Sequence, residues 1–438
     1  MNTLCLAVPE EKHAAGDDLA AWLANIERLH PKNIEMGLDR VKTVMERLEI
    51  RFDCPVLTVG GTNGKGSTCT MAQAIWQQAG YRTGLYTSPH IHHFSERLRI
   101  NGNPVSDEEI VRCFCAVEEA RGHIPLTFFE FTTLAILQIL ARAELDIVIL
   151  EVGLGGRLDA VNLIPADVAV VTNVDIDHVS YLGDTRELIG YEKAGIFRRG
   201  RIAVYGDADP PHSLVHHAAD IGADLRVAGR DFHVVHGCDC WDYQGSRLRF
   251  DRLPLPALRG KNQVRNACNA LMAIDALSAV LPVGESSIQK GLATAYLPGR
   301  FQVLGKRPDV ILDVAHNPHA ASVLASNLRE LGACRETHAV FGAMADKDIE
   351  GVVAQMRGEV GYWYLTDLPV ARAAQTPLLR EKLISAGVAD SRISLFRDVR
   401  AAMAMAKRRA RKDDRIVTFG SFWVVAGLTA DQTASLAR

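Results

Sequence analysis

The stretch V-G-G-T-N-G-K-G-S-T, residues 59–68, decides the fold of this chain. The apolar run 55–59 predicts a buried strand before it, and the pattern of residues 65–79 predicts a helix that Gly80 ends. Backbone N–H groups at the start of such a helix point at an anion, and the Lys65 ammonium can neutralise phosphate oxygens. We therefore predict a phosphate-binding loop; the alternative is a glycine-rich turn of structural use only.

This loop departs from the strict P-loop pattern G-x-x-x-x-G-K-[ST] at two positions. Val59 stands where the first glycine would be, and Gly66 replaces the Ser or Thr after the lysine. In the strict pattern that hydroxyl holds Mg²⁺, and Ser67 and Thr68 are out of register with it. A magnesium ion would therefore need ligands from other parts of the chain.

Outward from the loop, short apolar β-branched runs alternate with helical patterns, which is typical of parallel βαβ construction. The patterns predict strands at 83–86, 146–151 and 168–172 and helices at 131–143 and 262–280. Helical periodicity is lost over one long stretch, which predicts an irregular β insertion at 231–255.

A second alternating series follows Leu297, Pro298 and Gly299, and the Pro-Gly pair predicts an inter-domain hinge. Further strands are expected at 310–313, 338–341, 362–365, 393–396 and 416–419. We predict an α/β protein with two domains: a P-loop-containing parallel-sheet N-terminal domain at 1–297 and a smaller Rossmann-like α/β C-terminal domain at 298–438.

Composition narrows the class of protein. The chain has 438 residues, 23% of them charged, with a formal net charge of −3, which gives no signature of a nucleic-acid binder. Nine cysteines without C-x-x-C spacing argue against a disulfide framework and a zinc finger. The N-terminus lacks a signal-peptide pattern and no apolar run reaches membrane length. We expect a cytoplasmic protein with no membrane or nucleic-acid partner.

Acidic residues follow two of the predicted strands. Glu151 ends one strand, and Asp175, Asp177 and His178 come shortly after another. Ligands bind at the carboxyl ends of the strands in open α/β sheets, level here with the phosphate loop. Mg²⁺ takes oxygen ligands, usually only one or two of them carboxylates. From chemistry alone, Asp175 or Asp177 is a better magnesium ligand than the imidazole of His178.

Seven motifs, in order along nearly the whole chain, resemble the folylpolyglutamate synthases. The resemblance is closest to the bacterial bifunctional dihydrofolate synthase/folylpolyglutamate synthases, which are related to the Mur peptide ligases. The motifs are G-T-N-G-K-G at 61–66, T-S-P-H at 87–90 with Glu96 and Arg97, L-E-V-G-L-G-G-R-L-D at 150–159, D-I-D-H at 175–178, E-K-A-G-I-F at 192–197, L-P-G-R at 297–300 and D-V-A-H-N-P at 313–318.

This resemblance implies metal ligands at Ser88, Glu151 and His178, so that Ser88 supplies the hydroxyl that Gly66 lacks. Without it, Ser88 would be interpreted as a turn residue before a proline. The resemblance also implies that Lys193 is carbamylated, a carboxylate-like group that organises magnesium and water. Taken alone, a lysine near a helix end is most often a solvated cation.

The resemblance also implies an ATP site. Asn266, Arg300 and Asp313 correspond to ATP contacts, and His316 lies near the phosphates. A cation and a carboxylate beside the predicted hinge can hold a nucleotide between two lobes, although a structural Arg300–Asp313 salt bridge is the alternative. The loop residues that contact ATP are Thr62, Asn63, Gly64, Lys65, Gly66 and Ser67. The candidate catalytic residues are Lys65, Lys193 and His316.

Three segments resemble those that line the dihydropteroate site of the bifunctional enzymes. Phe128 and Phe129 precede a long apolar helix, and aromatic rings at a strand-to-helix junction can stack on a flat heterocycle; a core aromatic pair is the alternative. The segments are Asn33, Ile34 and Glu35; Leu126, Thr127, Phe128 and Phe129; and Leu158, Asp159 and Ala160.

The implied activity is an ATP- and Mg²⁺-dependent ligase that forms an acyl phosphate on a carboxylate and joins it to an amino acid. The implied substrates are dihydropteroate, tetrahydrofolates and L-glutamate, and we expect a monomer. Three alternatives remain: a folylpolyglutamate synthase without dihydrofolate synthase activity, a Mur-type peptidoglycan ligase, and a nucleotide-binding switch. The last would leave Ser88, Glu151, His178 and Lys193 unexplained.

Overall fold

The computed structural model describes residues 18–32, 34–237, 239–305 and 307–428. The chain forms two compact units, one of Met1–Arg51 with Val105–Ala143 and the other of Phe52–Pro104 with Glu144–Arg438. A helical unit is thus set apart from the rest of the N-terminal half. The domain boundary after residue 297 stays a prediction.

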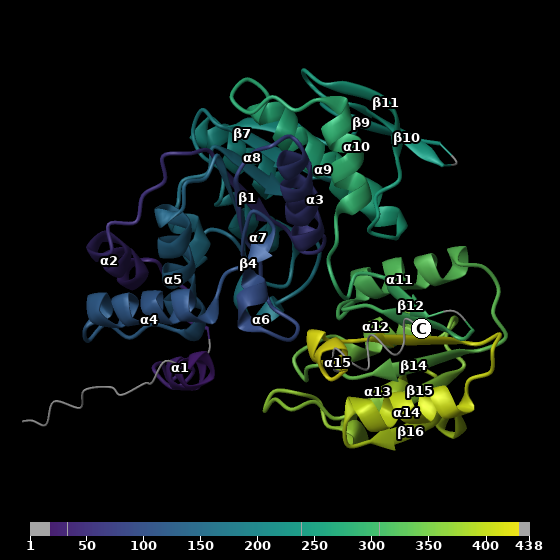
Figure 1. The fold of residues 1–438 in the computed structure, drawn as a ribbon. Coiled ribbons are helices and arrows are strands. Elements are labelled where there is room, and N and C mark those ends of the chain that lie inside the picture. Colours follow the sequence, from purple (N-terminus) through teal and green to yellow (C-terminus); the bar gives the residue numbers. More distant parts are fainter. Residues whose placement is uncertain (1–17, 33, 238, 306, 429–438) are drawn as a thin grey trace, which may run out of the picture. The chain divides into compact units, whose positions relative to one another are not determined.

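The helical unit has four helices in its described residues, drawn in purple and blue in Figure 1: α1 (Leu19–Ile26), α2 (Asp39–Arg47), α4 (Asp107–Arg121) and α5 (Phe128–Arg142). Helix α4 packs against both α5 and α1. The Phe114 ring lies edge-on to Phe131 at 5.6 Å and 6.1 Å from the Trp22 ring, centroid to centroid. These aromatic contacts give the unit a core of its own.

Helix α5 begins at Phe128, three residues before the predicted start at residue 131. Thr127 is its N-cap and forms a capping box with Glu130: the Glu130 N–H donates to Thr127 Oγ1, and the Thr127 N–H donates to Glu130 Oε2. The predicted strand-to-helix junction was wrong, because the loop before Thr127 connects α4 to α5. The two phenylalanines therefore belong to the first turn of the helix.

The second unit contains, in its described residues, a sheet of eight strands in the order β4-β3-β2-β5-β1-β6-β7-β8. The strands from β2 to β8 in this order are parallel, and β3 and β4 add an antiparallel edge that was not predicted. The predicted strands 55–59, 83–86, 146–151 and 168–172 are confirmed to within one residue at each end. The strands are β1 (Val56–Gly60), β2 (Thr83–Tyr86), β3 (Leu98–Ile100), β4 (Asn103–Pro104), β5 (Ile147–Glu151), β6 (Val168–Val171), β7 (Ile202–Tyr205) and β8 (Asp224–Val227).

Helices α3, α9 and α10 pack together on one face of this sheet (Figure 1). Their core includes Trp76 and Leu271, and Trp241 joins it from a three-stranded antiparallel sheet that confirms the predicted β insertion. That small sheet consists of β9 (His233–His236), β10 (Cys240–Gln244) and β11 (Arg249–Pro254). The helical elements of this part are α3 (Lys65–Gln78), η1 (Phe94–Arg97), η2 (Ala160–Leu163), α6 (Val179–Leu182), α7 (Arg186–Ala194), α8 (His212–Ile221), α9 (Lys261–Leu277) and α10 (Glu285–Thr294).

The C-terminal part of this unit is a second sheet, with the described strands in the order β12-β13-β17-β14-β15-β16. Strand β12 is antiparallel to β13 and was not predicted; the other pairs are parallel. All five predicted strands are confirmed to within one residue at each end. The strands are β12 (Gln302–Gly305), β13 (Asp309–Leu312), β14 (Thr337–Phe341), β15 (Tyr362–Thr366), β16 (Ile393–Phe396) and β17 (Arg415–Phe419).

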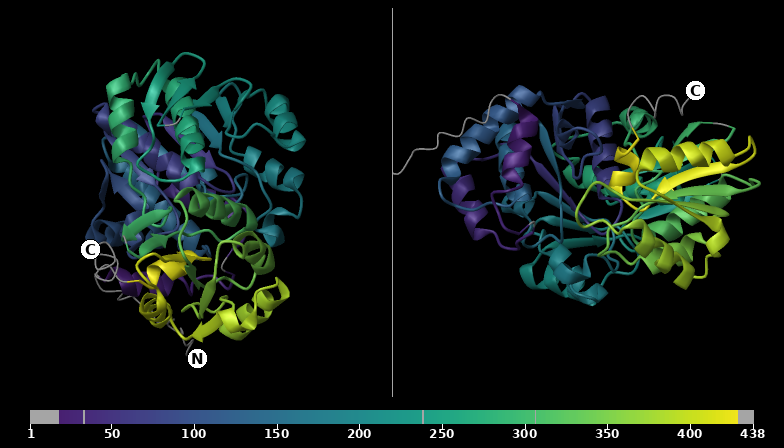
Figure 2. Two further views of the ribbon diagram at one scale, coloured as in Figure 1. Left: turned by 90° about the vertical axis from the view of Figure 1, so that its right-hand side faces the viewer. Right: turned by 90° about the horizontal axis from the view of Figure 1, so that it is seen from below.

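Helices cover both faces of this second sheet (Figure 2). Ile311 and Val417 pack with α11, α12 and α13, whereas their neighbours Val310 and Ile416 pack with α14 and α15. This alternation is expected of buried parallel strands with helices on both faces, so the predicted α/β fold class of the C-terminal part is confirmed. The helices are α11 (Pro318–Glu330), α12 (Ile349–Met356), α13 (Thr376–Ser385), η3 (Asp390–Arg392), α14 (Val399–Arg409) and α15 (Phe422–Ala426).

The carboxyl ends of the parallel strands carry the residues that the sequence singled out. The phosphate loop follows β1, Ser88 follows β2, Glu151 is the last residue of β5, and Asp313 follows β13. This edge is where open α/β sheets bind ligands. No helix among the described residues combines the length and the apolar character needed to cross a bilayer.

Candidate active site

The phosphate loop turns through two glycines with left-handed backbones. Gly61 has φ 138°, and Gly64, the N-cap of α3, has φ 87°. A Cβ on Gly61 would lie 1.9 Å from Thr172 Oγ1, and one on Gly64 would lie 2.4 Å from Asn266 Oδ1. Glycine is therefore required at both positions by the backbone conformation and by the neighbouring side chains.

Residues after β6 hold this loop in place. The Asn63 N–H donates to Asn173 Oδ1 at 3.0 Å, and the Asn63 carbonyl accepts from Thr172 Oγ1 at 2.6 Å. Lys65 Nζ folds back over the loop and donates to the carbonyls of Gly61 at 2.9 Å and Thr62 at 3.2 Å. The ammonium and the N-terminus of α3 thus lie at one preformed turn, the arrangement that binds phosphate.

Glu151 is buried and Lys65 is half-buried, and their opposite charges act on each other. Burial raises the pKa of Glu151, although Lys65 opposes the change; burial lowers the pKa of Lys65, although Glu151 opposes it. Glu151 Oε2 accepts from the Ser88 N–H at 3.1 Å. A Cβ on Gly66 would lie 3.5 Å from the same oxygen. The structure therefore brings Ser88, Glu151 and the phosphate loop together from three separate strands.

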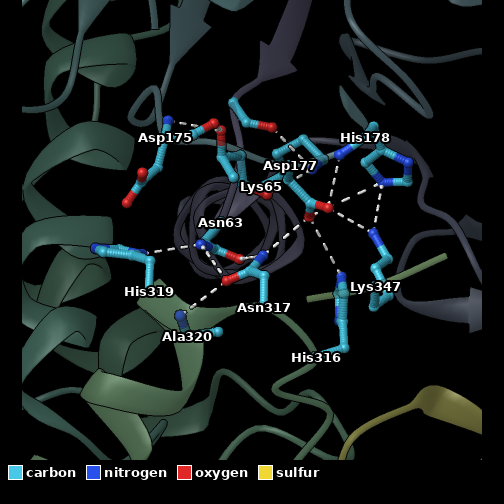
Figure 3. Close-up of polar contacts among 12 residues, drawn as sticks. Asn63, Lys65, Asp175, Asp177, His178, His316, Asn317, His319, Ala320 and Lys347 are labelled. Carbon is cyan, nitrogen blue, oxygen red and sulfur yellow. Dashed lines mark hydrogen bonds and ion pairs between the residues drawn. The ribbon is translucent and has the colours of Figure 1, made fainter. Parts of the chain in front are cut away.

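Asp177 and His178 meet the C-terminal part of the unit (Figure 3). Asp177 Oδ1 accepts from Lys347 Nζ at 2.5 Å, and its Oδ2 accepts from Asn317 Nδ2 at 2.9 Å. His316 Nε2 lies 3.6 Å from the same carboxylate. Hydrogen bonding from His316 and the nearby cations hold the pKa of Asp177 far below its usual value, although burial opposes them. The negative charge of this ionised carboxylate is already balanced by Lys347, so Glu151 is the better candidate to face a divalent cation.

His178 is the N-cap of α6 and has a left-handed backbone with φ 53°. Such a conformation is uncommon for a residue other than glycine and is a feature of functional sites. Burial lowers the pKa of His178 to about 4, which leaves a neutral imidazole. Its Nε2 lies 3.4 Å from Lys347 Nζ (Figure 3). A neutral ring of this kind is the form that coordinates metals.

Lys193 lies in the last turn of α7 and is only 4% exposed, so the interpretation as a solvated cation was wrong. Burial lowers the pKa of its ammonium to about 7, with a further contribution from the charge of Lys65. A substantial fraction of this amine is therefore neutral at physiological pH. Only the neutral form is nucleophilic, and this is the form that carbamylation requires.

Arg300 and Asp313 do not form the salt bridge that was the alternative interpretation. Asp313 accepts from the Phe301 N–H at 2.8 Å and, with its other oxygen, from the Ala315 N–H at 2.7 Å. Arg300 Nη1 is buried and has no hydrogen-bond partner among the described residues. The Arg300 guanidinium lies 5.0 Å from the centre of the Phe422 ring. A buried donor without a partner is costly, so Arg300 is suited to an anionic ligand.

A cavity of about 550 Å³ lies at this edge of the unit. It also contains His319, which the sequence interpretation did not select, and Lys347, whose loop at 342–348 was expected to face the cleft because it follows a strand. The predicted residues that line it are Thr62, Asn63, Gly64, Lys65, Gly66, Ser67, Ser88, Glu151, His178, Lys193, Asn266, Arg300, Asp313 and His316.

Comparisons with known proteins agree with this geometry. Residues 59–274 match the Mur ligase middle domain and residues 299–422 the Mur ligase glutamate ligase domain. The chain is 42% identical to the dihydrofolate synthase/folylpolyglutamate synthase of Escherichia coli (strain K12), over 94% of this chain and 95% of that one. The chain belongs to this family.

Two solved structures of the family are similar over nearly their full length. Escherichia coli FolC in complex with DHPP and ADP superimposes with a TM-score of 0.88 at 41% identity, covering 93% of this chain and 96% of that one. A bifunctional folylpolyglutamate synthase/dihydrofolate synthase with Mn, AMPPNP and L-glutamate bound gives 0.87 at 42% identity, covering 94% and 97%. This family uses ATP together with a divalent metal.

The residues present fit a divalent cation with few protein ligands. Among the described residues, no group of three or more His, Cys, Asp or Glu side chains is arranged to hold a metal. The predicted set instead offers one hydroxyl, one carboxylate and one imidazole at Ser88, Glu151 and His178. Mg²⁺ keeps several waters and shares phosphate oxygens in nucleotide sites, so such a sparse set is sufficient.

Asp159, one of the predicted substrate residues, is 5% exposed and caps η2. Its two carboxylate oxygens accept from the N–H groups of Leu154 at 2.8 Å and Val161 at 2.9 Å. Burial raises its pKa to about 6, although these amides oppose the change. Asp159 therefore shapes the loop between β5 and η2, and with it the positions of Leu158 and Ala160.

The other predicted substrate residues lie in the helical unit. Leu126 and Thr127 are buried, whereas Phe128 and Phe129 are only half-buried, unlike the core residue Phe131. The role of the two phenylalanines in a substrate site, in place of a core aromatic pair, stays a prediction. Ile34 and Glu35 are half-buried as well. Asn33 lies outside the described residues.

Proposed function

We propose that this chain joins L-glutamate to dihydropteroate and to reduced folates, using ATP and Mg²⁺ and releasing ADP. The observation that carries the proposal is the convergence of the phosphate loop, Glu151 and Arg300 in one cavity. A relative that covers nearly the whole chain bears the name of the bifunctional enzyme, which favours it over an enzyme that only extends glutamate chains.

The first step is an in-line attack of a substrate carboxylate on the γ-phosphate of ATP, which gives an acyl phosphate and ADP. The N-terminus of α3 and Lys65 hold the phosphates. Arg300, whose buried Nη1 has no hydrogen-bond partner among the described residues, supplies a cation for the charge that the transition state spreads over the phosphate oxygens. A bound magnesium ion neutralises phosphate charge. Glu151, Ser88 and His178 are the residues that would hold it.

The second step is attack of the L-glutamate amine on the acyl phosphate, with phosphate as the leaving group. Amide formation in water is unfavourable, so water has to be excluded from the acyl phosphate. The contacts of Asp177 with Lys347 and Asn317 join the loop after β6 to the loops after β14 and β13, and Asp177 and Lys347 line the cavity. His316, whose Nδ1 lies 2.9 Å from the Val314 carbonyl, faces the same space.

Lys193 is the residue that we propose to be carbamylated. Its neutral amine would add to CO₂, forming an N–C bond and releasing one proton, which converts the neutral amine into an anionic carbamate; starting from the ammonium form, two protons are released. Support comes from the burial of Lys193 and from its lowered pKa. The anion would lie near Lys65 and would relieve the repulsion between the two ammonium groups.

We also propose that the protein acts as a monomer in the cytoplasm. The buried cysteines Cys69, Cys113 and Cys268 are free thiols, which is usual in a reducing compartment. Light scattering coupled to gel filtration measures the molar mass directly, and a dimer would contradict the first part.

The experiment that tests the function is ADP release by the purified protein with Mg²⁺ and ATP. Dihydropteroate plus L-glutamate, and tetrahydrofolate plus L-glutamate, should each release ADP, and neither partner alone should do so. Activity with tetrahydrofolate only would identify a chain-extending enzyme. ADP release that is independent of both substrates would instead identify a nucleotide switch.

A further inference from the structure

Arg40, on α2, joins two of the segments that we assign to the dihydropteroate site. Its Nη2 donates to the Glu35 carbonyl at 2.7 Å, and its Nη1 lies 3.4 Å from Glu35 Oε1. The same guanidinium donates to both carboxylate oxygens of Glu130, at 2.5 and 3.1 Å. One side chain therefore contacts the segment 34–35 and the first turn of α5 together.

Glu130 carries this contact to the aromatic residues. Its Oε2 also accepts from the Thr127 N–H at 2.8 Å, which closes the capping box at the start of α5. Phe128 and Phe129 are the first two residues of that helix. The position of Arg40 thus sets the position of the turn that bears both rings relative to Glu35.

The contact is buried and depends on the shape of arginine. The side chains of Arg40 and Glu130 are 19% and 6% exposed. A planar guanidinium can donate to both oxygens of a carboxylate and, from its other edge, to a carbonyl, whereas a lysine ammonium is a single point of charge. Arg47, on the same helix, differs: it is exposed and donates to the Ala120 carbonyl at the end of α4.

We propose that Arg40 is a positioning residue for the pterin-bearing substrate, acting through Glu35 and Glu130 without itself touching the substrate. This inference rests on the proposed function and on the assignment of segments 33–35 and 126–129 to the dihydropteroate site. Holding the two segments in the binding arrangement removes the ordering cost that the substrate would otherwise meet. Loss of Arg40 therefore acts on folate binding and leaves the ATP site, which lies in the other unit, unchanged.

Three variants test the proposal. Arg40→Lys keeps the positive charge but loses the planar guanidinium that donates to both oxygens of Glu130. The double variant Arg40→Met with Glu130→Gln removes the buried pair without leaving a lone carboxylate, and glutamine preserves the capping box. Arg47→Gln is the control on the same helix. We expect the Michaelis constant for dihydropteroate to rise about tenfold or more in the double variant and less in Arg40→Lys, because small displacements of binding groups are costly.

Other measurements separate this role from a purely structural one. The Michaelis constant for ATP should stay within about twofold of wild type in every variant, since no distant contact is removed. Arg47→Gln should change neither constant. Arg40 variants that lose only thermal stability, with the dihydropteroate constant unchanged, would overturn the proposal.

Phe128→Leu and Phe129→Leu distinguish failure of the inference from failure of the site. A raised dihydropteroate constant in either phenylalanine variant, with none in the Arg40 variants, would refute the role of Arg40 and leave the site in place. No change in any of these variants would refute both the inference and the assignment of the segments. A change in all of them is the result that we expect.

Discussion

Two clusters of charged side chains in the second unit differ in how far ion-pair and hydrogen-bond partners within the chain balance their charges. Around the phosphate loop, burial lowers the pKa of Lys65, Lys193 and Arg300 and raises the pKa of Glu151, so each group is shifted toward its neutral form. At the opposite edge of the C-terminal sheet, Asp414 Oδ2 accepts from Arg335 at 2.6 Å and faces His338 Nε2 at 3.3 Å.

These partners, together with the Arg411 N–H, hold the pKa of Asp414 below its usual value, although burial opposes them. Asp414 Oδ2 therefore has its partners within the chain, although Asp414 Oδ1 is buried without a hydrogen-bond partner among the described residues. The groups around the phosphate loop are instead shifted toward their neutral forms. A nucleotide brings several negative charges and a metal ion two positive ones. Buried groups whose pKa is shifted toward the neutral form therefore mark the place where the ligands bind, whereas a buried carboxylate that is paired within the chain marks structural support.

The largest effect should come from Lys65→Ala. Removing the ammonium from the phosphate loop should lower kcat by roughly a hundredfold to a thousandfold, the usual effect of losing one charged donor to a transition state. Lys65 bonds only to loop carbonyls, so the melting temperature should change little. Steady-state kinetics and a thermal scan on the same preparation test this, and wild-type turnover would show that the loop does not act on phosphate.

Glu151→Gln should have the next largest effect. The change is nearly isosteric and removes one negative charge, and the Ser88 N–H can still donate to the amide oxygen. The magnesium concentration for half-maximal activity should rise by about tenfold or more, because so few protein ligands hold the ion. An unchanged magnesium dependence, measured by titration at saturating ATP, would remove Glu151 from the metal site. The magnesium dependence of Asp177→Asn is a useful comparison, because Lys347 already balances the charge of Asp177 in an ion pair.

Much of this arrangement could be predicted from sequence, and the parts that could not have physical reasons. The predicted strands were found because parallel buried strands read as continuous apolar runs. Strands β3, β4 and β12 were missed because short antiparallel edge strands lack that signal. The start of α5 was missed although T-F-F-E at 127–130 is a capping box, which a closer interpretation of Thr127 and Glu130 would have found.

For the site, the sequence placed Glu151 and the phosphate loop at one edge, because strand order makes carboxyl ends adjacent. It could not show that Lys193 is buried, since a lysine near a helix end is usually exposed. It also could not show that Asp177 pairs with Lys347, a residue far away in the chain that packing alone brings close. Chemistry alone favoured Asp175 or Asp177 over His178 as a magnesium ligand, whereas partners such as Lys347 determine whether the Asp177 carboxylate is free to hold the ion.

Asp414→Asn tests the structural half of the comparison. Here we expect a lower melting temperature with kcat and both Michaelis constants unchanged. Loss of hydrogen bonds to a charged group costs about 1.5–3 kcal/mol, and the cost is nearer the lower end because Arg335 is 44% exposed and can turn to water. The matched control is Asp390→Asn, which breaks an exposed ion pair with Arg380 and should have almost no effect on stability. A loss of activity in Asp414→Asn, at a temperature where it is folded, would contradict the division into two kinds of cluster.

The last effect that we predict is a pH dependence of stability from Lys193. Its pKa is about 7 in the folded chain, against about 10.5 for an ordinary lysine. Between these two values the unfolded chain binds a proton that the folded chain does not, so stability rises with pH. Below pH 7 both states carry the charge, and the full cost of burying it is present.

Lys193→Met removes this titration while keeping an apolar chain of similar length. In buffers depleted of CO₂, the variant should melt at a higher temperature than wild type at pH 6, and the difference should shrink as the pH rises to 9. The change across this range is only a part of the full effect, because only part of the interval between the two pKa values is crossed. Added bicarbonate should stabilise the wild type near pH 8, since it converts the neutral amine to a carbamate, and should leave the variant unaffected. A melting-temperature difference that is the same at pH 6 and pH 9 would show that the Lys193 amine does not titrate in this range.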